Sequence, residues 1–294
     1  MRVAILGCGY VGLELGRQLT AAGHDVVGVR RSDAGLDAIE TAGFEAMRAD
    51  LTDEASLVAV PDVDWAVYAA SAGGRGVDAA RAAYVDGLRT VVAAFGTRES
   101  PPDRLVYTSS TGVYGDHGGD WVNESTTPDP ATDRQRVLLE AERVALKETA
   151  THDIDGTVVR FGGLYGPDRY RMDRYLDGPV TEGYLNSIHR DDAASVVAHL
   201  LTADVARGEV VLAVDDDPVS KWDFADWLAE QCGVSPPKKW TVAERAATTE
   251  GEVSRRARAN KRCANDRLHR LGYELQYPTV REGYLPAIRA FRDD

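Results

Sequence analysis

The chain begins with an apolar segment that runs directly into a glycine-rich turn. Val3–Leu6 is short, apolar and partly β-branched, as in a strand buried on both faces. The turn that follows reads Gly7-x-Gly9-x-x-Gly12. Apolar residues then recur at helical spacing as far as Gly23, where a helix would end. Strand, glycine turn and helix in this order predict the first unit of a dinucleotide-binding fold.

Each glycine of this turn has its own expected role. Gly7 would allow the tight turn, Gly9 would let the backbone approach a pyrophosphate, and Gly12 would let helix and strand pack closely. The anion would sit at the helix N-terminus, where N–H groups and the helix dipole favour negative charge. An ordinary glycine-rich turn is the alternative, which a second strand at the expected distance disfavours. The residues expected to contact the cofactor here are Gly7, Gly9, Tyr10, Val11 and Gly12.

Strand and helix candidates alternate through the first half, which predicts an α/β fold with a doubly wound parallel sheet. The strand candidates are Val3–Leu6, Asp25–Arg30, Phe44–Arg48, Trp65–Ala70, Arg104–Ser109 and Gly156–Arg160. The helix candidates are Val11–Ala22, Gly35–Ala42, Glu54–Val60, Val77–Gly96 and Thr132–Ala150. We expect a Rossmann-type NAD(P)-binding domain over residues 1–160. A smaller, mainly substrate-binding lobe over 161–294 would be interleaved with the end of the sheet, to which later segments add strands.

The second half of the chain is less regular. Residues 162–186 are rich in Gly, Tyr, Arg and Asp, which predicts a segment that is mostly loop. The polar and charged stretch 236–259 predicts an exposed loop. The remaining candidates are the helix Asp191–Leu201, the strand Glu209–Val214, the helix Ser220–Cys232, and the last helices Ala264–Leu271 and Thr279–Arg292. Ser220 is the expected N-cap of its helix, with Gly233 just past the end.

Charge and cysteine usage exclude several function classes. A formal net charge of −13 argues against nonspecific binding to nucleic acid or to an anionic membrane. No apolar run approaches the roughly 20 residues of a membrane span, and the N-terminus reads as a core strand instead of a signal peptide. Cys8, Cys232 and Cys263 show neither zinc nor disulfide spacing, so we expect no metal and a cytoplasmic location.

Lysine is scarce among the 34 basic residues, of which all but five are arginine. Scarce Lys with surplus Asp is typical of a salt-adapted, halophile-like protein. A GC-rich genome that favours arginine codons is the alternative, and composition does not separate the two.

The end of the second strand decides which nicotinamide cofactor such a fold takes. An NAD protein usually places Asp or Glu there, where it accepts a hydrogen bond from the ribose 2′-OH. Here the sequence reads Arg30-Arg31-Ser32, and two guanidinium groups can hold a 2′-phosphate bidentately. This favours NADP(H), with NAD(H) as the alternative. The arginines would otherwise form a solvated charge pair, or Asp33 would turn back to the ribose.

Further short motifs follow along the chain in order. They are Asp50-Leu51-Thr52, Tyr68-Ala69-Ala70-Ser71, Tyr107-Thr108-Ser109-Ser110 with Val113-Tyr114-Gly115, Arg160 with Leu164-Tyr165-Gly166-Pro167, and Ile188-His189-Arg190-Asp191-Asp192. Together with the glycine turn, they resemble the extended short-chain dehydrogenase/reductase family, in its NAD-dependent epimerase/dehydratase group. The resemblance covers nearly the whole chain and implies a small-molecule substrate, such as a nucleotide sugar.

The resemblance also implies how the cofactor groove is lined. Asp50 and Leu51, after the third strand, would border the adenine. Ala69, Ala70 and Ser71, at the end of the fourth strand, would line the groove, in agreement with the rule that ligands bind beyond the carboxyl ends of parallel strands. Asp50 capping the following helix, and close packing of the two alanines, are the alternatives.

The chain departs from the family at the catalytic pair. In the family, a Tyr and a Lys four residues later share one helix face. The Tyr transfers a proton, the Lys holds the ribose, and a Ser or Thr fixes the substrate oxygen. Ser110 matches the hydroxyl position, but Thr132 and Arg136 stand in the places of Tyr and Lys. This pattern resembles the atypical subgroup, and it makes Ser110, Thr132 and Arg136 the candidate catalytic residues.

The roles of these replacements stay open. Arg136 can bind the ribose or a phosphate, whereas Thr132 can order a water or simply cap the helix.

Another side chain would then have to supply the acid: Tyr114, Tyr165, His189 or His117. Tyr165 and His189 lie in segments that border the substrate in the family, and Arg262 matches a region where relatives bring an Arg to a substrate phosphate. Loop packing, a structural hydrogen bond and an exposed charge run, respectively, are the alternatives for these three.

Two functions fit the sequence. The first is an NAD(P)-dependent oxidoreductase or epimerase acting on a sugar nucleotide or another hydroxylated or carbonyl metabolite. The second is a catalytically impaired NADP(H)-binding sensor or regulatory protein. The cleft motifs and Ser110 favour the enzyme, and Thr132 and Arg136 favour the sensor. Relatives commonly dimerise through helices that include the one near Thr132, so a homodimer is possible.

Overall fold

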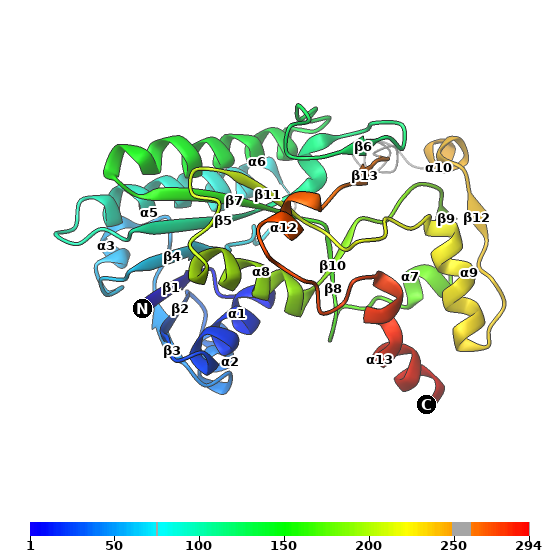
Figure 1. Cartoon of the computed structure of the whole chain (residues 1–294), viewed down its shortest axis with the longest axis horizontal. Coiled ribbons are helices and arrows are strands. Elements are labelled where there is room, and N and C mark those ends of the chain that lie inside the picture. Colours follow the sequence, from blue (N-terminus) through cyan, green and yellow to red (C-terminus); the bar gives the residue numbers. More distant parts are fainter. Residues whose placement is uncertain (75, 249–259, 294) are drawn as a thin grey trace. The chain divides into compact units, whose positions relative to one another are not determined.

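The N-terminal apolar segment forms strand β1 (Arg2–Leu6), which lies inside a seven-stranded parallel sheet of order β11-β7-β5-β4-β1-β2-β3 (Figure 1). Leu6 lies opposite Val29 of the neighbouring strand β2 and opposite Tyr68 of β4. Residues Val3–Leu6 are fully buried, as expected for a strand covered on both faces. The predicted α/β class and doubly wound sheet are therefore confirmed.

The computed structural model describes residues 1–74, 76–248 and 260–293. The chain divides into two compact units. Unit 1 comprises residues 1–110, 133–160 and 193–211, and unit 2 comprises 111–132, 161–192 and 212–294.

Unit 1 contains the sheet and the helices that cover it. Its strands are β1 (Arg2–Leu6), β2 (Asp25–Arg30), β3 (Glu45–Arg48), β4 (Trp65–Tyr68), β5 (Arg104–Ser110), β7 (Asp155–Phe161) and β11 (Val210–Ala213), of which the last two end in unit 2. Its helices are α1 (Tyr10–Ala21), α2 (Asp33–Thr41), α3 (Glu54–Leu57), α4 (Val77–Arg81), α5 (Gly87–Gly96), α6 (Asp133–Arg143) and most of α8 (Arg190–Thr202). Helices α5 and α6 cover one face of the sheet, and α1, α2 and α8 cover the other (Figure 1).

Unit 2 is built from short elements and two longer helices. Its strands are β6 (Trp121–Val122), β8 (Gly163–Tyr165), β9 (Val180–Thr181), β10 (Ser187–His189), β12 (Lys239–Trp240) and β13 (Arg262–Cys263). Its helices are α7 (Asp173–Leu176), α9 (Lys221–Cys232), α10 (Val242–Thr248), α12 (Asp266–Arg270) and α13 (Val280–Asp293). An aromatic core around Tyr165, Phe224 and Tyr284 joins α9 and α13.

Capping residues fix the ends of two helices in unit 2, and those of α9 were expected from the sequence. The hydroxyl of Ser220 accepts a hydrogen bond from the N–H of Asp223, and Gly233 ends α9 with φ = +70°. Thr279 and Glu282 cap α13 reciprocally, since each side chain accepts from the backbone N–H of the other.

Two predicted helices carry irregular segments. Between α4 and α5 lies a π-helical turn, Ala82–Asp86, and a second one, Val144–Glu148, follows α6. The hydroxyl of Tyr68 donates to the carbonyl of Ala83 at 2.5 Å, so a side chain from β4 satisfies a backbone group in the first of these turns. Apolar periodicity does not distinguish a π turn from an α turn, and the sequence therefore predicted one uninterrupted helix.

Residues 162–186 are mostly loop, as predicted, and the short elements β8, α7 and β9 form within them. Each contains at most four residues, too few to show a period. The predicted loop 236–259 contains β12 and α10, and its last part, 249–259, lies outside the described residues.

Candidate cofactor site

The glycine turn packs directly against the end of β4. Gly7 has φ = +81°, and its N–H donates to the carbonyl of Val29 at 3.1 Å. A β-carbon on Gly7 would lie 2.3 Å from the α-carbon of Ala70, so only glycine fits this position. Gly12 is also constrained, though less tightly, because a β-carbon there would lie 2.9 Å from a side-chain methyl of Ile5. The turn thus brings β1, α1 and the segment after β4 together, as the sequence predicted.

The N-terminus of α1 follows the turn. Its N-cap is Gly9, and within the described residues no side chain caps it by a hydrogen bond. A β-carbon on Gly9 would meet only the Nη1 of Arg30, at 3.1 Å, and the carbonyl of Gly7, at 3.7 Å. The twelve-residue helix has no acidic residue in its first turn. Its dipole therefore favours an anion such as a pyrophosphate at this end.

Arg30 turns back toward this glycine turn. Its Nη1 donates to the carbonyl of Cys8 at 3.1 Å, and the side chain is partly buried. The expectation of a solvated charge pair therefore does not hold for Arg30. Arg31 is different, because 72% of its side chain is exposed and its Nη1 lies 3.8 Å from the carboxylate of Asp50.

Asp33, the alternative partner of a ribose, forms an ion pair with Arg48 of β3. Its side chain is largely exposed. Ser32 precedes it as the N-cap residue of α2, and within the described chain its side chain makes no capping hydrogen bond.

Asp50 closes a tight turn after β3. Its Oδ1 accepts from the N–H of Thr52 at 3.0 Å and from the Thr52 hydroxyl at 2.7 Å. These hydrogen bonds lower the pKa of Asp50, with Arg31 adding a smaller effect. The helix α3 is capped instead by Asp53, which accepts from Ala55, so the expected alternative role for Asp50 is not observed. Leu51 packs against the main core.

Ala69, Ala70 and Ser71 follow β4 directly, and the N–H of Ala69 donates to the carbonyl of Leu6 at 2.8 Å. They lie at the carboxyl end of β4, beside the glycine turn. Cys8 is buried there, and burial raises the pKa of its thiol to about 12. The thiol therefore stays protonated near neutral pH and supplies no nucleophile.

The proposed catalytic positions lie at the ends of β5 and α6. Ser110 is the last residue of β5 and is partly buried. Thr132, immediately before α6, is 3% exposed. Arg136 has 58% of its side chain exposed and pairs with Asp133 one turn before it. The catalytic assignments of all three stay predictions.

A phenol and a guanidinium that the sequence did not single out meet in unit 1. Nη2 of Arg134 donates to the hydroxyl oxygen of Tyr84 at 2.8 Å. The N–H of Ala72 approaches the same oxygen, at 3.4 Å. Tyr84 and Arg134 are 50 residues apart, and no family motif contains both, so no sequence signal pointed to this pair.

The substrate residues predicted in unit 2 are held in its interior. Tyr165 is 4% exposed, stacks on Tyr284 and donates to the carbonyl of Thr279 at 3.5 Å. Burial raises the pKa of its phenol well above the usual range. His189 is 2% exposed, and its Nδ1 accepts from the N–H of Asp191 at 3.2 Å, as in a neutral imidazole.

Asp192 has a role that the sequence did not reveal. Its buried carboxylate accepts from the Tyr273 hydroxyl at 2.9 Å and from the N–H groups of Gln276 and Tyr277 at 2.7 and 2.9 Å. Asp192 lies in the first turn of α8, and its side chain anchors the segment 273–277. Charge-assisted hydrogen bonds of this kind are among the strong ones in proteins.

Arg262 lies between two aromatic rings. Its guanidinium carbon is 5.1 Å from the centre of the Trp121 ring and 5.0 Å from that of Tyr184. Its Nε donates to the carbonyl of Gly119 at 2.8 Å. The roles of Tyr165, His189 and Arg262 toward a substrate stay predictions.

Among the five lysines, Lys261 is buried in unit 2 and Lys221 is partly buried there. Nζ of Lys221 donates to the carbonyl of Glu182 at 3.4 Å, and Nζ of Lys261 donates to that of Gly115 at 3.3 Å. Burial is the largest cause that lowers the pKa of Lys221, and together with the charges of Arg174 and Lys261 it brings that pKa to about 8.

This burial makes a testable prediction about pH. The unfolded Lys221 titrates near pH 10.4, so between about pH 8 and 10.4 the unfolded chain binds more protons than the folded one. The penalty for the buried charge is fully present below about pH 8 and is relieved as the pH rises. From about pH 7.5 to 10, we expect the free energy of unfolding of the wild type to gain about 2 kcal/mol relative to Lys221→Met.

Urea unfolding of both proteins across this range measures the difference, because other titrating groups are shared and cancel. Parallel pH profiles of the two proteins would contradict the prediction.

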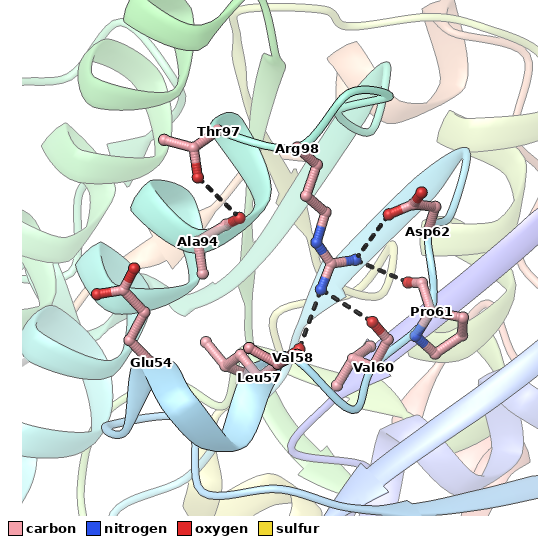
Figure 2. Close-up of a pocket in the computed structure, with 9 residues that line it drawn as sticks. All are labelled: Glu54, Leu57, Val58, Val60, Pro61, Asp62, Ala94, Thr97 and Arg98. Carbon is pink, nitrogen blue, oxygen red and sulfur yellow. Dashed lines mark hydrogen bonds and ion pairs between the residues drawn. The ribbon is translucent and has the colours of Figure 1, made fainter.

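Unit 1 contains a pocket of about 400 Å³ that lies between α3, the segment after α3 and the end of α5 (Figure 2). Arg98 fills one side of it. Its two terminal nitrogens donate to the carbonyls of Leu57, Val60 and Pro61 at 2.8 to 3.0 Å. The guanidinium also lies 4.1 Å from the centre of the Phe95 ring. Because these donors are already satisfied by the end of α3, Arg98 stabilises this corner of the fold.

Among residues 1–74, 76–248 and 260–293, no helix is long and apolar enough to cross a membrane. The same described residues contain no group of His, Cys, Asp and Glu side chains arranged to hold a metal ion.

The parallel sheet, the glycine turn against Ala70 and the N-terminus of α1 define a protein that binds a dinucleotide. The comparison with known families agrees, since a family described as NAD(P)H-binding matches residues 7–204. The chain belongs to this NAD(P)H-binding family, and its cofactor is a nicotinamide dinucleotide.

Relatives and solved structures extend this result along the whole chain. Protein YeeZ of Escherichia coli K12 is 28% identical over 94% of this chain and 96% of its own length. The structure of a putative NAD-dependent epimerase/dehydratase from Methylobacillus flagellatus is 30% identical, covers 100% of this chain and 99% of that one, and has a TM-score of 0.78. A 3β-hydroxysteroid dehydrogenase/Δ5→4-isomerase of Mycobacterium tuberculosis is 28% identical over 79% of this chain and 69% of its own length. The resemblance to the epimerase/dehydratase group is thus confirmed.

Proposed function

We propose that the protein is an NADP(H)-dependent oxidoreductase that acts on a hydroxylated or carbonyl metabolite. The observation that carries the cofactor preference is the position of Arg30. This residue ends β2, and its guanidinium lies against the glycine turn that follows β1. Arg31 adds a second, exposed guanidinium at the same strand end. No carboxylate follows directly, and Asp33 is engaged by Arg48. A 2′-phosphate suits this charge better than a 2′-hydroxyl.

The chain's own residues would divide the work as follows. The N-terminus of α1 holds the pyrophosphate, and Arg30 and Arg31 hold the 2′-phosphate. Asp50 and Leu51 border the adenine, and Ala69, Ala70 and Ser71 line the groove. The nicotinamide supplies hydride transfer when bound. The hydroxyl of Ser110 orients the substrate oxygen.

The substrate class rests on the relatives. One relative is described as an epimerase/dehydratase and another as a hydroxysteroid dehydrogenase, and both descriptions imply a secondary alcohol or its ketone. A sugar nucleotide is one member of that class. A homodimer through the helix near Thr132 stays a prediction.

The missing Tyr–Lys pair supports a second candidate, an NADP(H)-binding sensor that does not turn over substrate. Tight NADPH binding with no consumption across a broad panel of ketones and sugar nucleotides would favour the sensor. Turnover that is lost in Ser110→Ala would favour the enzyme.

The cofactor preference can be tested directly by fluorescence titration with NADPH and NADH in high-salt buffer. For the wild type we expect NADPH to bind at least about tenfold more tightly than NADH, because charge-assisted hydrogen bonds hold the 2′-phosphate. Arg30→Ala combined with Arg31→Ala should remove this preference while NADH binding changes little.

Arg17→Ala is the matched control, because Arg17 is an exposed arginine of unit 1 that is already paired with Glu14. It removes one arginine charge from unit 1, where the double variant removes two, and should retain the preference. Equal affinity of the wild type for both cofactors would overturn the assignment to NADP(H).

A further inference from the structure

The pair formed by Tyr84 and Arg134 combines the two groups that the family's helix lacks here, a phenol and a permanent cation. Arg134 donates to the phenol oxygen at 2.8 Å, and its guanidinium carbon lies 5.5 Å from the centre of the Tyr84 ring. Tyr84 is 9% exposed. Both residues belong to unit 1, as do the glycine turn and Ser110.

An irregular backbone presents Tyr84 at this place. It is the middle residue of the π-helical turn Ala82–Asp86, between α4 and α5. The neighbouring carbonyl of Ala83 accepts the hydrogen bond of the Tyr68 hydroxyl, which ties the turn to β4. π turns inside helices occur frequently at functional sites, where they re-aim a side chain.

The order of the strands in the sheet indicates that Tyr84 lies near the nicotinamide half of the cofactor. The glycine turn after β1 takes the pyrophosphate, and the arginines after β2 take the adenosine side. Strands β4 and β5 lie on the opposite side of β1, so the nicotinamide half extends over their carboxyl ends. Ala72, which contacts the Tyr84 oxygen, follows β4 by four residues.

We propose that Tyr84 and Arg134 replace the missing Tyr–Lys pair, with Tyr84 as the proton donor and Arg134 as the cation that holds the nicotinamide ribose. This inference rests on the proposed function. The phenol oxygen accepts from Arg134 and from Ala72, which leaves its own O–H to donate. Arg134 itself stays protonated and donates no proton to chemistry.

In the proposed step, a carbonyl group is reduced to an alcohol by one hydride and one proton. The reduced nicotinamide provides two electrons as hydride to the carbonyl carbon and is oxidised. The O–H bond of Tyr84 breaks, and its proton forms the new alcohol with the carbonyl oxygen. The negative charge left on the Tyr84 oxygen faces the guanidinium of Arg134 and the N–H of Ala72 until solvent returns a proton.

The experiment compares Tyr84→Phe, Arg134→Ala and Arg134→Lys with a matched control, Tyr107→Phe. Tyr107 is a fully buried phenol of β5, and its hydroxyl has no hydrogen-bond partner among the described residues. Removing that oxygen makes the same chemical change as Tyr84→Phe without touching the pair. Circular dichroism and thermal unfolding confirm that each variant is folded.

Two quantities are measured: the Kd for NADPH by fluorescence, and the rate of NADPH consumption with 9,10-phenanthrenequinone as the carbonyl probe. We expect Arg134→Ala to raise the Kd at least about tenfold and Arg134→Lys to recover part of the loss. Tyr84→Phe should lower kcat by about 100-fold or more, as for the loss of a general acid, and leave the Kd within about threefold. Tyr107→Phe should match the wild type in both.

The role proposed for Tyr84 is overturned if Tyr84→Phe consumes NADPH as fast as Tyr107→Phe. The role proposed for Arg134 is overturned if Arg134→Ala binds NADPH as tightly as the wild type. Binding without turnover in the wild type would overturn the proton-donor role, and the Kd of Arg134→Ala still decides the cofactor role. A folded wild type that binds no NADPH would overturn the proposed function instead.

Discussion

Gly7→Ala is expected to abolish NADPH binding while the protein stays folded but less stable. The new methyl group would lie 2.3 Å from the α-carbon of Ala70 and 2.5 Å from its nitrogen, and both are backbone atoms that no rotamer change can move. The positive φ of Gly7 adds about 1–2 kcal/mol of strain for a residue with a β-carbon. The glycine turn must therefore shift away from the segment after β4, and the anion site at α1 shifts with it. NADPH titration should show an increase in Kd of more than about 100-fold.

Gly23→Ala separates the clash from the strain. Gly23 lies just after α1 and has φ = +85°, but a β-carbon there would meet nothing within 4 Å. This variant should lose about 1 kcal/mol of stability and keep the wild-type Kd. Loss of NADPH binding in both variants, or in neither, would contradict the role assigned to the contact between Gly7 and Ala70.

Glu142→Ala is expected to lower the free energy of unfolding by about 3–5 kcal/mol. Glu142 of α6 accepts two hydrogen bonds from Arg160 of β7, at 3.0 and 2.7 Å, and one from the hydroxyl of Ser109, at 2.6 Å. The side chains of the ion pair are only 5–6% exposed. Removing the carboxylate leaves the charge of Arg160 buried without its counter-ion, which is the costly half of such a pair. Urea unfolding measures the loss.

Glu148→Ala is the matched control, because Glu148 pairs with Arg89 at the surface and is 44% exposed. Its loss should not exceed about 1 kcal/mol and should vanish in high salt, where the Glu142 effect persists. Replacing Glu142 and Arg160 together with methionine should recover much of the stability. A cost for Glu142→Ala as small as that of the control would show that the buried pair contributes little.

Several features are predictable because the local sequence determines them. A strand, a glycine turn and a helix are adjacent in the chain, so the spacing of Gly7, Gly9 and Gly12 together with the flanking strand and helix patterns identifies the cofactor turn. The alternation of strand and helix patterns predicts the sheet for the same reason, and Ser220 with Gly233 marks the two ends of α9.

Other features depend on residues that are distant in the sequence. Arg134 contacts Tyr84 only because α6 and the π turn pack on the same face of the sheet. Neither segment carries a sequence pattern that predicts this contact. The local sequence around Asp192 does not reveal that its carboxylate binds the segment 273–277, which is distant in the chain. Two-residue strands such as β9 and β12 are defined only by their hydrogen-bonded pairing with each other, which the local sequence does not show.

The chain crosses between the two units five times, after residues 110, 132, 160, 192 and 211. Neither unit is therefore a continuous stretch of polypeptide, and no truncation at a single point yields one of them whole. A ribosome releases the first 110 residues of unit 1 long before β7 and β11 exist, so the sheet stays without its last strands until more than two thirds of the chain has been synthesised. Exchange of unit 2 between relatives by recombination would likewise require three separate segments to be replaced together.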